Sequence, residues 1–176
     1  LNAFPDLNVV HLGSLMLSEK KGRAIAKRVA DKTKEIGAKL SFDVNFRKDI
    51  FRDFDAAKRA YEPFVKRADI VKFSEDELLD FTGISGIDAA AESLCDKDKL
   101  ILVTLGKNGS AYYFNGEKGV VPSEYKCKSV DTTGAGDAFF GAFLAAIENK
   151  KPTKENIVSA MRKGNEKGAK TTEFFG

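Results

Sequence analysis

The sequence predicts an α/β fold with a largely parallel sheet flanked by helices, and three observations carry this prediction. Short apolar runs of strand length alternate with helix-length segments through the first part of the chain, a succession that builds parallel sheets. Two closely spaced turns then predict an antiparallel hairpin. A glycine-rich turn finally opens an apolar helix. A chain of 176 residues suits one such unit, so we expect residues 1–176 to form a single α/β domain.

The composition, with 43% hydrophobic and 31% charged residues, is typical of a globular protein. The net charge of +3 is small and no lysine-rich or arginine-rich block occurs, so we expect no nucleic-acid partner. Every apolar run is shorter than the roughly 18 residues that indicate a membrane helix, so we expect no membrane partner. We also expect no signal peptide before the first strand.

Cys95 and Cys127 lie far apart without a CxxC spacing, and the chain has one histidine, His11. This set does not suggest a zinc site of the usual kind, and a reducing, cytoplasmic setting fits it best. We interpret both cysteines as ordinary buried or half-buried thiols and His11, near a strand end, as structural.

The first predicted unit is a strand, a helix and a second strand. Residues 7–12 and 39–43 are the two strands. Between them, Ser18 is a candidate N-cap for a helix that Gly37 is placed to end. The apolar side of this helix is expected to carry Ile25, Val29 and Ile36.

A second helix is predicted over residues 56–66, with an interruption at Pro63, and a third strand over residues 68–73. Ser74 and Glu77 then have the spacing of a capping box, which predicts a helix start. Glu77 has a second interpretation, because acids at the carboxyl end of a strand can hold Mg²⁺, usually through water. Both roles hold only if Glu77 turns away from its capping partner.

The antiparallel part follows a further helix at residues 87–96. Residues 100–104 form an apolar run of strand length, and the Asn-Gly pair at 108–109 predicts a turn after it. Residues 110–114 are expected to pair back, and a second Asn-Gly pair at 115–116 marks the next turn.

One segment combines an apolar helix with polar chemistry. Residues 138–147 are apolar or glycine at every position, which predicts a helix buried on all sides. Gly134, Ala135 and Gly136 come before it, so free backbone N–H groups at the helix start could bind a phosphate. Asp137 in the first turn could take a proton from a hydroxyl nucleophile. The alternative is that Asp137 only favours the helix dipole, which is worth about 0.3–1 kcal/mol.

Polar side chains also follow the second strand. Asp43, Asn45 and Arg47 alternate with apolar residues just past its carboxyl end. In open α/β sheets, ligands bind at this edge. The alternative is that these residues only bond loop backbone, since Asp and Asn are common in loops.

Four segments together resemble one known family. Residues 131–144 fit a kinase signature at every constrained position, and residues 104–109 look like the nucleotide-side strand and turn of the same proteins. Residues 43–47 look like a DxNxR segment, and residues 71–77 are similar to an NxxE segment, with Ser74 where many members have Asn. The chain therefore resembles the ribokinase (PfkB) family of carbohydrate kinases, and the serine favours its fructokinase-like branch.

The resemblance implies a ribokinase-like (Rossmann-like) fold and ATP-dependent phosphorylation of a sugar's primary hydroxyl, with fructose as the leading acceptor. Asp137 would be the catalytic base and would contact the sugar with Asn45 and Arg47. The turn formed by Gly134, Ala135 and Gly136 would be the anion hole.

The same resemblance implies the cofactor sites. Glu77 would order Mg²⁺ through water, and Asp131 and Thr133 would belong to a monovalent-cation site for K⁺. The residues that would line the ATP site are Thr104, Gly106, Gly109, Gly136 and Asn165.

The resemblance does not include the family's N-terminal portion, which carries the first strands, a glycine pair, a sugar-binding Asp and a β lid. We therefore expect a fold that lacks these strands and the lid. Because a lid excludes water, we expect weak sugar binding and low or absent transfer by this chain alone. The exposed sheet edge would invite association, and the family implies a homo-oligomer, a dimer, for the full-length protein.

Two alternatives are left open by the sequence. Within the family, the acceptor could be that of a ribokinase, a 2-keto-3-deoxygluconate kinase or a nucleoside kinase. In the other alternative, the chain is a non-catalytic nucleotide-binding fragment that needs its N-terminal portion or a partner. A dehydrogenase is not favoured, because no GxGxxG follows the first strand.

Overall fold

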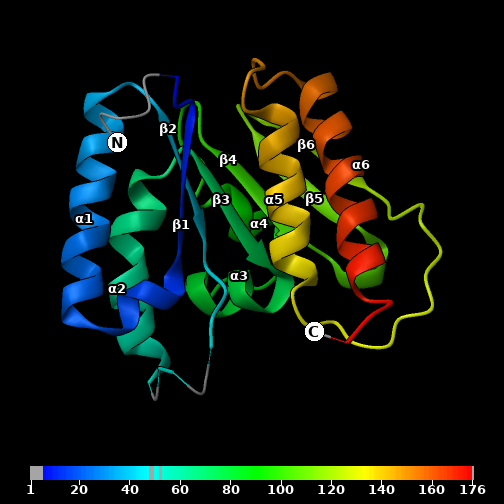
Figure 1. Cartoon of the computed structure of the whole chain (residues 1–176), viewed down its shortest axis with the longest axis horizontal. Coiled ribbons are helices and arrows are strands. Elements are labelled where there is room, and N and C mark those ends of the chain that lie inside the picture. Colours follow the sequence, from blue (N-terminus) through cyan, green and yellow to red (C-terminus); the bar gives the residue numbers. More distant parts are fainter. Residues whose placement is uncertain (1–5, 48–49, 52, 176) are drawn as a thin grey trace.

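A mixed six-stranded sheet organises the computed structural model, which describes residues 6–47, 50, 51 and 53–175 (Figure 1). The strands are β1 (Val9–Gly13), β2 (Lys39–Asp43), β3 (Ile70–Ser74), β4 (Leu100–Thr104), β5 (Ser110–Phe114) and β6 (Glu117–Val121). They lie side by side in chain order, so β1 is at one edge of the sheet. The strands β1 to β4 pair in parallel, whereas β4, β5 and β6 pair antiparallel. The predicted fold class is confirmed.

Helices cover both faces of the sheet (Figure 1). One face carries α1 (Lys20–Glu35), α2 (Phe54–Arg67), α3 (Glu75–Thr82) and α4 (Ile87–Glu92), and the other carries α5 (Ala135–Ile147) and α6 (Lys154–Thr171). Strand β4 contributes to both cores because side chains alternate along a strand. Ile101 and Val103 belong to the core under α1 to α4, and Leu100 and Leu102 belong to the core under α5 and α6.

The carboxyl ends of the parallel strands meet at one edge of the sheet. The register pairs Gly13 with Asp43 and Ser74 with Thr104. Lys72 of β3 pairs with Asp43 of β2, so these two side chains leave the sheet on the same face. This edge therefore gathers polar residues from separate parts of the sequence.

Two glycines of α6 let α5 lie very close to it. A Cβ atom built on Gly164 would lie 2.8 Å from the Phe139 ring, and one built on Gly168 would lie 3.0 Å from the Ala135 carbonyl oxygen. Real Cβ atoms essentially never reach the first distance. The start of α5 is thus held against the C-terminal half of α6.

The start of the first helix differs from the prediction. Glu19, not Ser18, is the N-cap of α1, and the Ser18 hydroxyl instead donates to the Leu15 carbonyl at 3.0 Å. A 3₁₀ turn at Ser14–Ser18 takes up this segment, and a Cβ on Gly22 would lie only 1.7 Å from the Met16 carbonyl oxygen. Ser18 belongs to this turn, and its hydroxyl bonds within the turn and does not cap α1.

The buried side of α1 was predicted correctly for Val29, which packs against the core, and wrongly for the two isoleucines. Ile25 is 53% exposed and Ile36 is 36% exposed. The buried residues are the smaller Ala26, Ala30 and Thr33. Close packing of the helix selects small side chains, so the bulkiest apolar residues do not mark its inner face.

Helix α5 is not buried on all sides. Phe139, Phe140 and Phe143 are buried, whereas Gly141 and Ala145 are exposed. Small apolar residues therefore cover its outer side, and an apolar run alone did not distinguish them from core residues. Pro63 lies inside an uninterrupted α2, and α4 ends at Glu92, earlier than predicted.

Candidate active site

An open cavity lies where the ends of β2 and β3 meet the start of α5, and its volume is about 240 Å³. From the sheet it is lined by Asn45, Arg47 and Lys72, and from the α5 side by Thr132, Thr133, Gly134, Gly136 and Asp137. Predicted site residues from two distant parts of the sequence therefore line one cavity. A larger depression of about 590 Å³ on the outer side of α1 contains none of the predicted site residues.

The first turn of α5 is open. Its N-cap is Gly134, which has φ +76° in the left-handed region and makes no side-chain cap. The Ala135 N–H donates to the Thr132 carbonyl at 3.2 Å. Among the described residues, the N–H groups of Gly136 and Asp137 have no hydrogen-bond partner. With the positive end of the helix dipole, they form a site suited to an anion.

The Asp137 carboxylate is exposed at this open turn. It is the acid of the first turn of α5. A carboxylate beside free N–H donors can take a proton from a hydroxyl group while the donors hold the anion that the hydroxyl attacks. The geometry therefore allows both parts of a phosphoryl transfer in one place.

The loop before α5 is held by its own hydrogen bonds. One carboxylate oxygen of Asp131 accepts from the Thr133 N–H at 2.9 Å and from the Thr133 hydroxyl at 2.8 Å. The N–H groups of Val130 and Asp131 donate to the Thr172 carbonyl at 2.7 and 3.1 Å. The two residues predicted for a monovalent cation thus contact each other, and their cation role stays a prediction.

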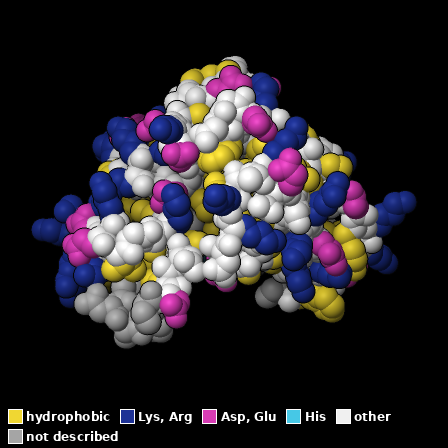
Figure 2. Space-filling view, turned by 90° about the horizontal axis from the view of Figure 1, so that it is seen from above, with side chains coloured by type: hydrophobic (Ala, Val, Ile, Leu, Met, Phe, Trp, Pro, Cys, Tyr) yellow, Lys and Arg dark blue, Asp and Glu magenta, His cyan; other side chains and the backbone are white. Residues whose placement is uncertain are grey.

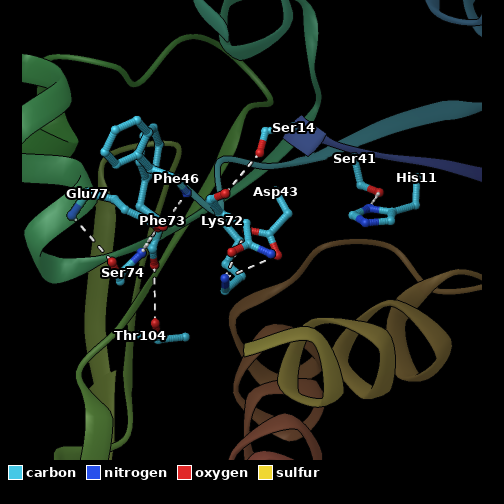
Figure 3. A network of polar contacts seen from close by, with 11 residues as sticks. His11, Ser14, Ser41, Asp43, Phe46, Lys72, Phe73, Ser74, Glu77 and Thr104 are labelled. Atoms are coloured by element: carbon cyan, nitrogen blue, oxygen red, sulfur yellow. Dashed lines mark hydrogen bonds and ion pairs between the residues drawn. The ribbon is translucent and has the colours of Figure 1, made fainter. Parts of the chain in front are cut away.

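The sequence did not identify Lys72 as a site residue. Its ammonium lies 2.9 and 3.2 Å from the two carboxylate oxygens of Asp43, and both side chains are buried (Figure 3). Burial raises the pKa of Asp43 above its ordinary value, and the Lys72 ammonium opposes that rise. A lysine in the otherwise apolar strand β3 was the signal that could have revealed this pair.

The segment after β2 is strained at Asn45. This residue has φ +28°, which is uncommon for a residue other than glycine. Its carbonyl accepts from the Ser14 hydroxyl at 3.0 Å. Asn45 and the exposed Arg47 both line the cavity, so the segment is positioned for ligand contact.

Glu77 keeps its capping role. One carboxylate oxygen accepts from the Ser74 N–H at 2.7 Å and the other accepts from the Phe46 N–H at 2.8 Å (Figure 3). The Ser74 hydroxyl in turn accepts from the Glu77 N–H at 3.3 Å, which completes the capping box. Glu77 therefore does not turn away from Ser74. The condition that Glu77 must turn away was too strict, because each carboxylate oxygen keeps a further lone pair for water while the cap is kept. The water-mediated Mg²⁺ contact stays a prediction.

The predicted ATP residues of the hairpin lie away from the cavity lining. Thr104 is next to Ser74 in the sheet, and its hydroxyl donates to the Phe73 carbonyl at 3.4 Å. Gly106 has φ +56° and faces open space, whereas a Cβ on Gly109 would lie 2.2 Å from the Val121 carbonyl oxygen. Gly109 therefore has a structural reason to be glycine, and its contact with ATP stays a prediction.

Asn165 of α6 is buried, and both its side-chain oxygen and its side-chain nitrogen are hydrogen-bonded. It accepts from the Ser110 hydroxyl at 2.9 Å and donates to the Val121 carbonyl at 2.9 Å. These hydrogen bonds link α6 to β5 and β6. The structure thus gives Asn165 a packing role, and its predicted contact near ATP is untested.

His11 lies on β1 near the cavity. Its Nδ1 atom is 3.0 Å from the Ser41 hydroxyl, and its ring packs edge-on against Phe140 with centroids 5.2 Å apart. Burial lowers the pKa of His11, the negative charge of Asp137 opposes this, and the positive charge of Lys72 adds to it. The structural role expected for His11 agrees with these contacts.

Other features of the described residues bear on ligands and membranes. No group of three or more His, Cys, Asp or Glu side chains within residues 6–47, 50, 51 and 53–175 is arranged to hold a metal ion. None of the helices in that part of the chain is both long and apolar enough to cross a membrane. Lys and Arg side chains are mixed with acidic ones over the face seen in Figure 2.

The whole chain, rather than the cavity alone, matches a family model. The model describes a pfkB family carbohydrate kinase, and it matches residues 2–174. The chain belongs to the pfkB family of carbohydrate kinases. This family membership confirms the predicted resemblance and agrees with the open turn and the acid at the start of α5.

Plant proteins named fructokinase are among the relatives of this pfkB chain. Fructokinase-1 of Oryza sativa subsp. japonica is 39% identical over 173 residues, which cover 89% of this chain and 53% of the relative. Fructokinase-1 of Zea mays is also 39% identical, over 93% of this chain and 52% of the relative. The chain thus spans about half the length of the curated relatives that it matches.

Solved structures agree with the fold. A fructokinase from Vibrio cholerae O395 in a fructose, ADP and calcium ion bound form superposes with a TM-score of 0.89 at 30% identity, covering 97% of this chain and 56% of that one. An aminoimidazole riboside kinase from Salmonella enterica, complexed with aminoimidazole riboside and an ATP analog, gives 0.86 at 26% identity, with 97% and 58% covered. The predicted ribokinase-like fold is therefore confirmed.

Proposed function

We propose that this chain is the catalytic portion, in one α/β domain, of an ATP-dependent sugar kinase, with fructose as its acceptor. The observation that carries the activity is the Asp137 carboxylate beside the unpaired N–H groups of Gly136 and Asp137 in one cavity. The names of the rice and maize relatives and the fructose in the Vibrio structure support the acceptor.

In this mechanism Asp137 takes the proton of the sugar's primary hydroxyl. The resulting oxygen attacks the γ-phosphorus of ATP, a new oxygen–phosphorus bond forms, and the bond to the β-phosphate oxygen breaks as ADP leaves. The open turn from Gly134 to Gly136 stabilises the charge on the transferring group. Such transfers depend mainly on positioning and electrostatic stabilisation, which this turn provides.

The remaining site residues take supporting roles. Asn45 and Arg47 would contact the sugar from the sheet edge. Thr104, Gly106, Gly109 and Asn165 would contribute to the ATP side. A bound Mg²⁺ would neutralise phosphate charge, with Glu77 ordering it through water, and Asp131 and Thr133 would hold K⁺.

The activity is tested by adding ATP and a panel of sugars to the chain joined to the N-terminal half of the rice relative. Fructose should be phosphorylated in preference to ribose, 2-keto-3-deoxygluconate and nucleosides. Brisk turnover of another acceptor with none of fructose would contradict the proposed substrate. Full activity of an Asp137→Asn variant would contradict the proposed base.

A second function is favoured by the length of the chain, which spans about half of its relatives. In this alternative the chain alone binds ATP but does not transfer phosphate. Calorimetry and a kinase assay on the same sample separate the two. Binding without turnover by the chain, with turnover after joining the N-terminal half, would assign catalysis to the combined protein.

We further propose a dimer for the full-length protein and a cytoplasmic location. The dimer is proposed from the resemblance to the family, and the two free cysteines support the location. Light scattering and fractionation of the source cells are the direct tests.

A further inference from the structure

Lys72 places a buried positive charge in the wall of the cavity. The residue is 4% exposed, yet its side chain lines the cavity with Gly136 and Asp137. It comes from β3, where its neighbours Val71 and Phe73 are fully buried apolar residues. A buried charge is costly unless it is paired, so its presence calls for a physical reason.

The Lys72 ammonium is paired with Asp43, but this pairing does not use all of the N–H donors of the ammonium. The ammonium donates to both carboxylate oxygens of Asp43, at 2.9 and 3.2 Å. An ammonium has three N–H donors. Within the described part of the chain, the third donor of Lys72 has no partner. One donor is thus left beside the cavity.

The ammonium also lies directly against the open turn of α5. A Cβ atom built on Gly136 would lie 3.1 Å from Nζ and 3.5 Å from Cε of Lys72. The absence of a side chain at Gly136 therefore gives the ammonium its place beside the turn. The N–H donor of Lys72 that Asp43 does not use thus lies beside the partial positive charge that a helix N-terminus carries.

We propose that Lys72 is an anion-binding residue of the phosphate site, where its ammonium holds the phosphoryl group that docks on the α5 turn. This role deepens the proposed kinase function, and rests on it for the identity of the anion as a polyphosphate. Asp43 fixes the ammonium in place. The site then has two sets of donors for an anion, the backbone N–H groups of the turn and the ammonium of a lysine from the sheet.

If the Lys72–Asp43 pair served only the fold, its removal would leave anion binding unchanged. Anion binding can therefore distinguish the two roles. The probe is inorganic tripolyphosphate, titrated into the 176-residue chain by calorimetry without metal. Lys72→Met removes the ammonium but leaves Asp43 buried and unpaired, which could unfold the chain. The double variant Lys72→Met/Asp43→Leu removes both charges, keeps the net charge of the protein and avoids the unpaired carboxylate.

Lys99 offers a matched control. It is a second nearly buried lysine, and its ammonium donates to the Val65 and Lys66 carbonyls at the end of α2. Lys99→Met removes one positive charge away from the cavity. Circular dichroism confirms that each protein is folded before titration.

The double variant should bind tripolyphosphate at least about tenfold more weakly than the unaltered chain, as expected for a lost charge-assisted hydrogen bond. Lys99→Met should bind within about twofold of the unaltered chain, because screening weakens a distant charge. Equal affinity of the double variant and the unaltered chain would overturn the role of Lys72, as would failure of the unaltered chain to bind. Lys72-dependent binding by a protein that phosphorylates no sugar would instead retain the anion site and remove the kinase function.

Discussion

Helices α3 and α5 begin near the same edge of the sheet, but their first-turn N–H groups are capped differently. The start of α3 is closed, because Ser74 and Glu77 satisfy each other's backbone N–H groups. The start of α5 is open, with Gly134 as N-cap and no side-chain cap. A helix start can thus use its N–H groups for its own stability or leave them for a ligand.

The open end of α5 needs support from elsewhere. Gly164 and Gly168 let α6 lie close against it, and the Thr172 carbonyl holds the loop that leads into it. The support therefore comes from packing and backbone bonds outside the turn. This difference between α3 and α5 can be tested by changing each end separately.

The largest effect is expected at the acid of the open turn. Asp137→Asn in the chain joined to the N-terminal half of a relative should lower kcat by about 10²–10⁴, the usual contribution of a general base. Asp76→Asn is the matched control, because Asp76 is an exposed acid in the first turn of α3. It should leave kcat unchanged. Similar losses in both variants, measured with ATP and fructose, would mean that the two helix starts do not differ in function.

The second largest effect is expected from a change in the packing of α6 against α5, which supports the open turn. Gly164→Ala should lower the free energy of unfolding by about 1–3 kcal/mol, because its Cβ would overlap the Phe139 ring. Gly141→Ala, on the exposed side of α5 with nothing within 4 Å, should instead raise it by about 0.5–1 kcal/mol. Urea unfolding measures both changes. A stabilising Gly164→Ala would show that α6 does not need close contact there.

Removing the cap at the start of α3 should change the stability of the protein but not its binding of tripolyphosphate. Ser74→Ala should lower the free energy of unfolding by about 0.5–2 kcal/mol through loss of the cap. Ser18→Ala is the control, because this serine caps no helix. Urea unfolding and tripolyphosphate titration of each variant give the two readouts. Weaker tripolyphosphate binding by Ser74→Ala would contradict the separation of the two helix starts.

The smallest effect concerns the single histidine. Because Asp137 raises and Lys72 lowers the pKa of His11, Asp137→Asn should lower that pKa further, and the double variant Lys72→Met/Asp43→Leu should raise it. Proton NMR titration reads the His11 ring signals without overlap from another histidine. An unchanged His11 pKa in both variants would show that neither charge affects this residue.

The same residue gives a pH dependence of stability. The pKa of His11 in the folded chain is below its ordinary value of about 6.5, so the unfolded chain binds its proton more readily. Stability should therefore be lost as the pH falls below that value. Urea unfolding of a His11→Gln variant should show less of this loss.

Sequence patterns predicted the parts of the fold that local chemistry determines. Strands 39–43, 100–104 and 110–114 have the predicted bounds, because short alternating or apolar runs beside turn residues leave few alternatives. The capping box of Ser74 and Glu77 was also visible in the sequence. The wrong N-cap at Ser18 arose because this serine belongs to a 3₁₀ turn, in which its hydroxyl bonds to the Leu15 carbonyl.

The candidate site was predicted in part for a similar reason. Asn45 and Arg47 could be placed at a ligand-binding edge because they follow a parallel strand, and the family resemblance joined Asp137 to them. Lys72 was missed, because its role depends on Asp43 across the strand pair and on the space that Gly136 leaves. The local pattern shows only that a lysine interrupts the apolar residues of β3, and it does not show which distant segments contact that lysine.

The central claim is that the open start of α5, and not the closed start of α3, receives the phosphates. The most direct test is a two-dimensional ¹H–¹⁵N NMR titration of the chain with ATP. The largest shifts should come from the amides of Gly134, Gly136 and Asp137, with none at Glu75 and Asp76. Shifts that centre on α3, or that spread evenly over both helix starts, would contradict the claim.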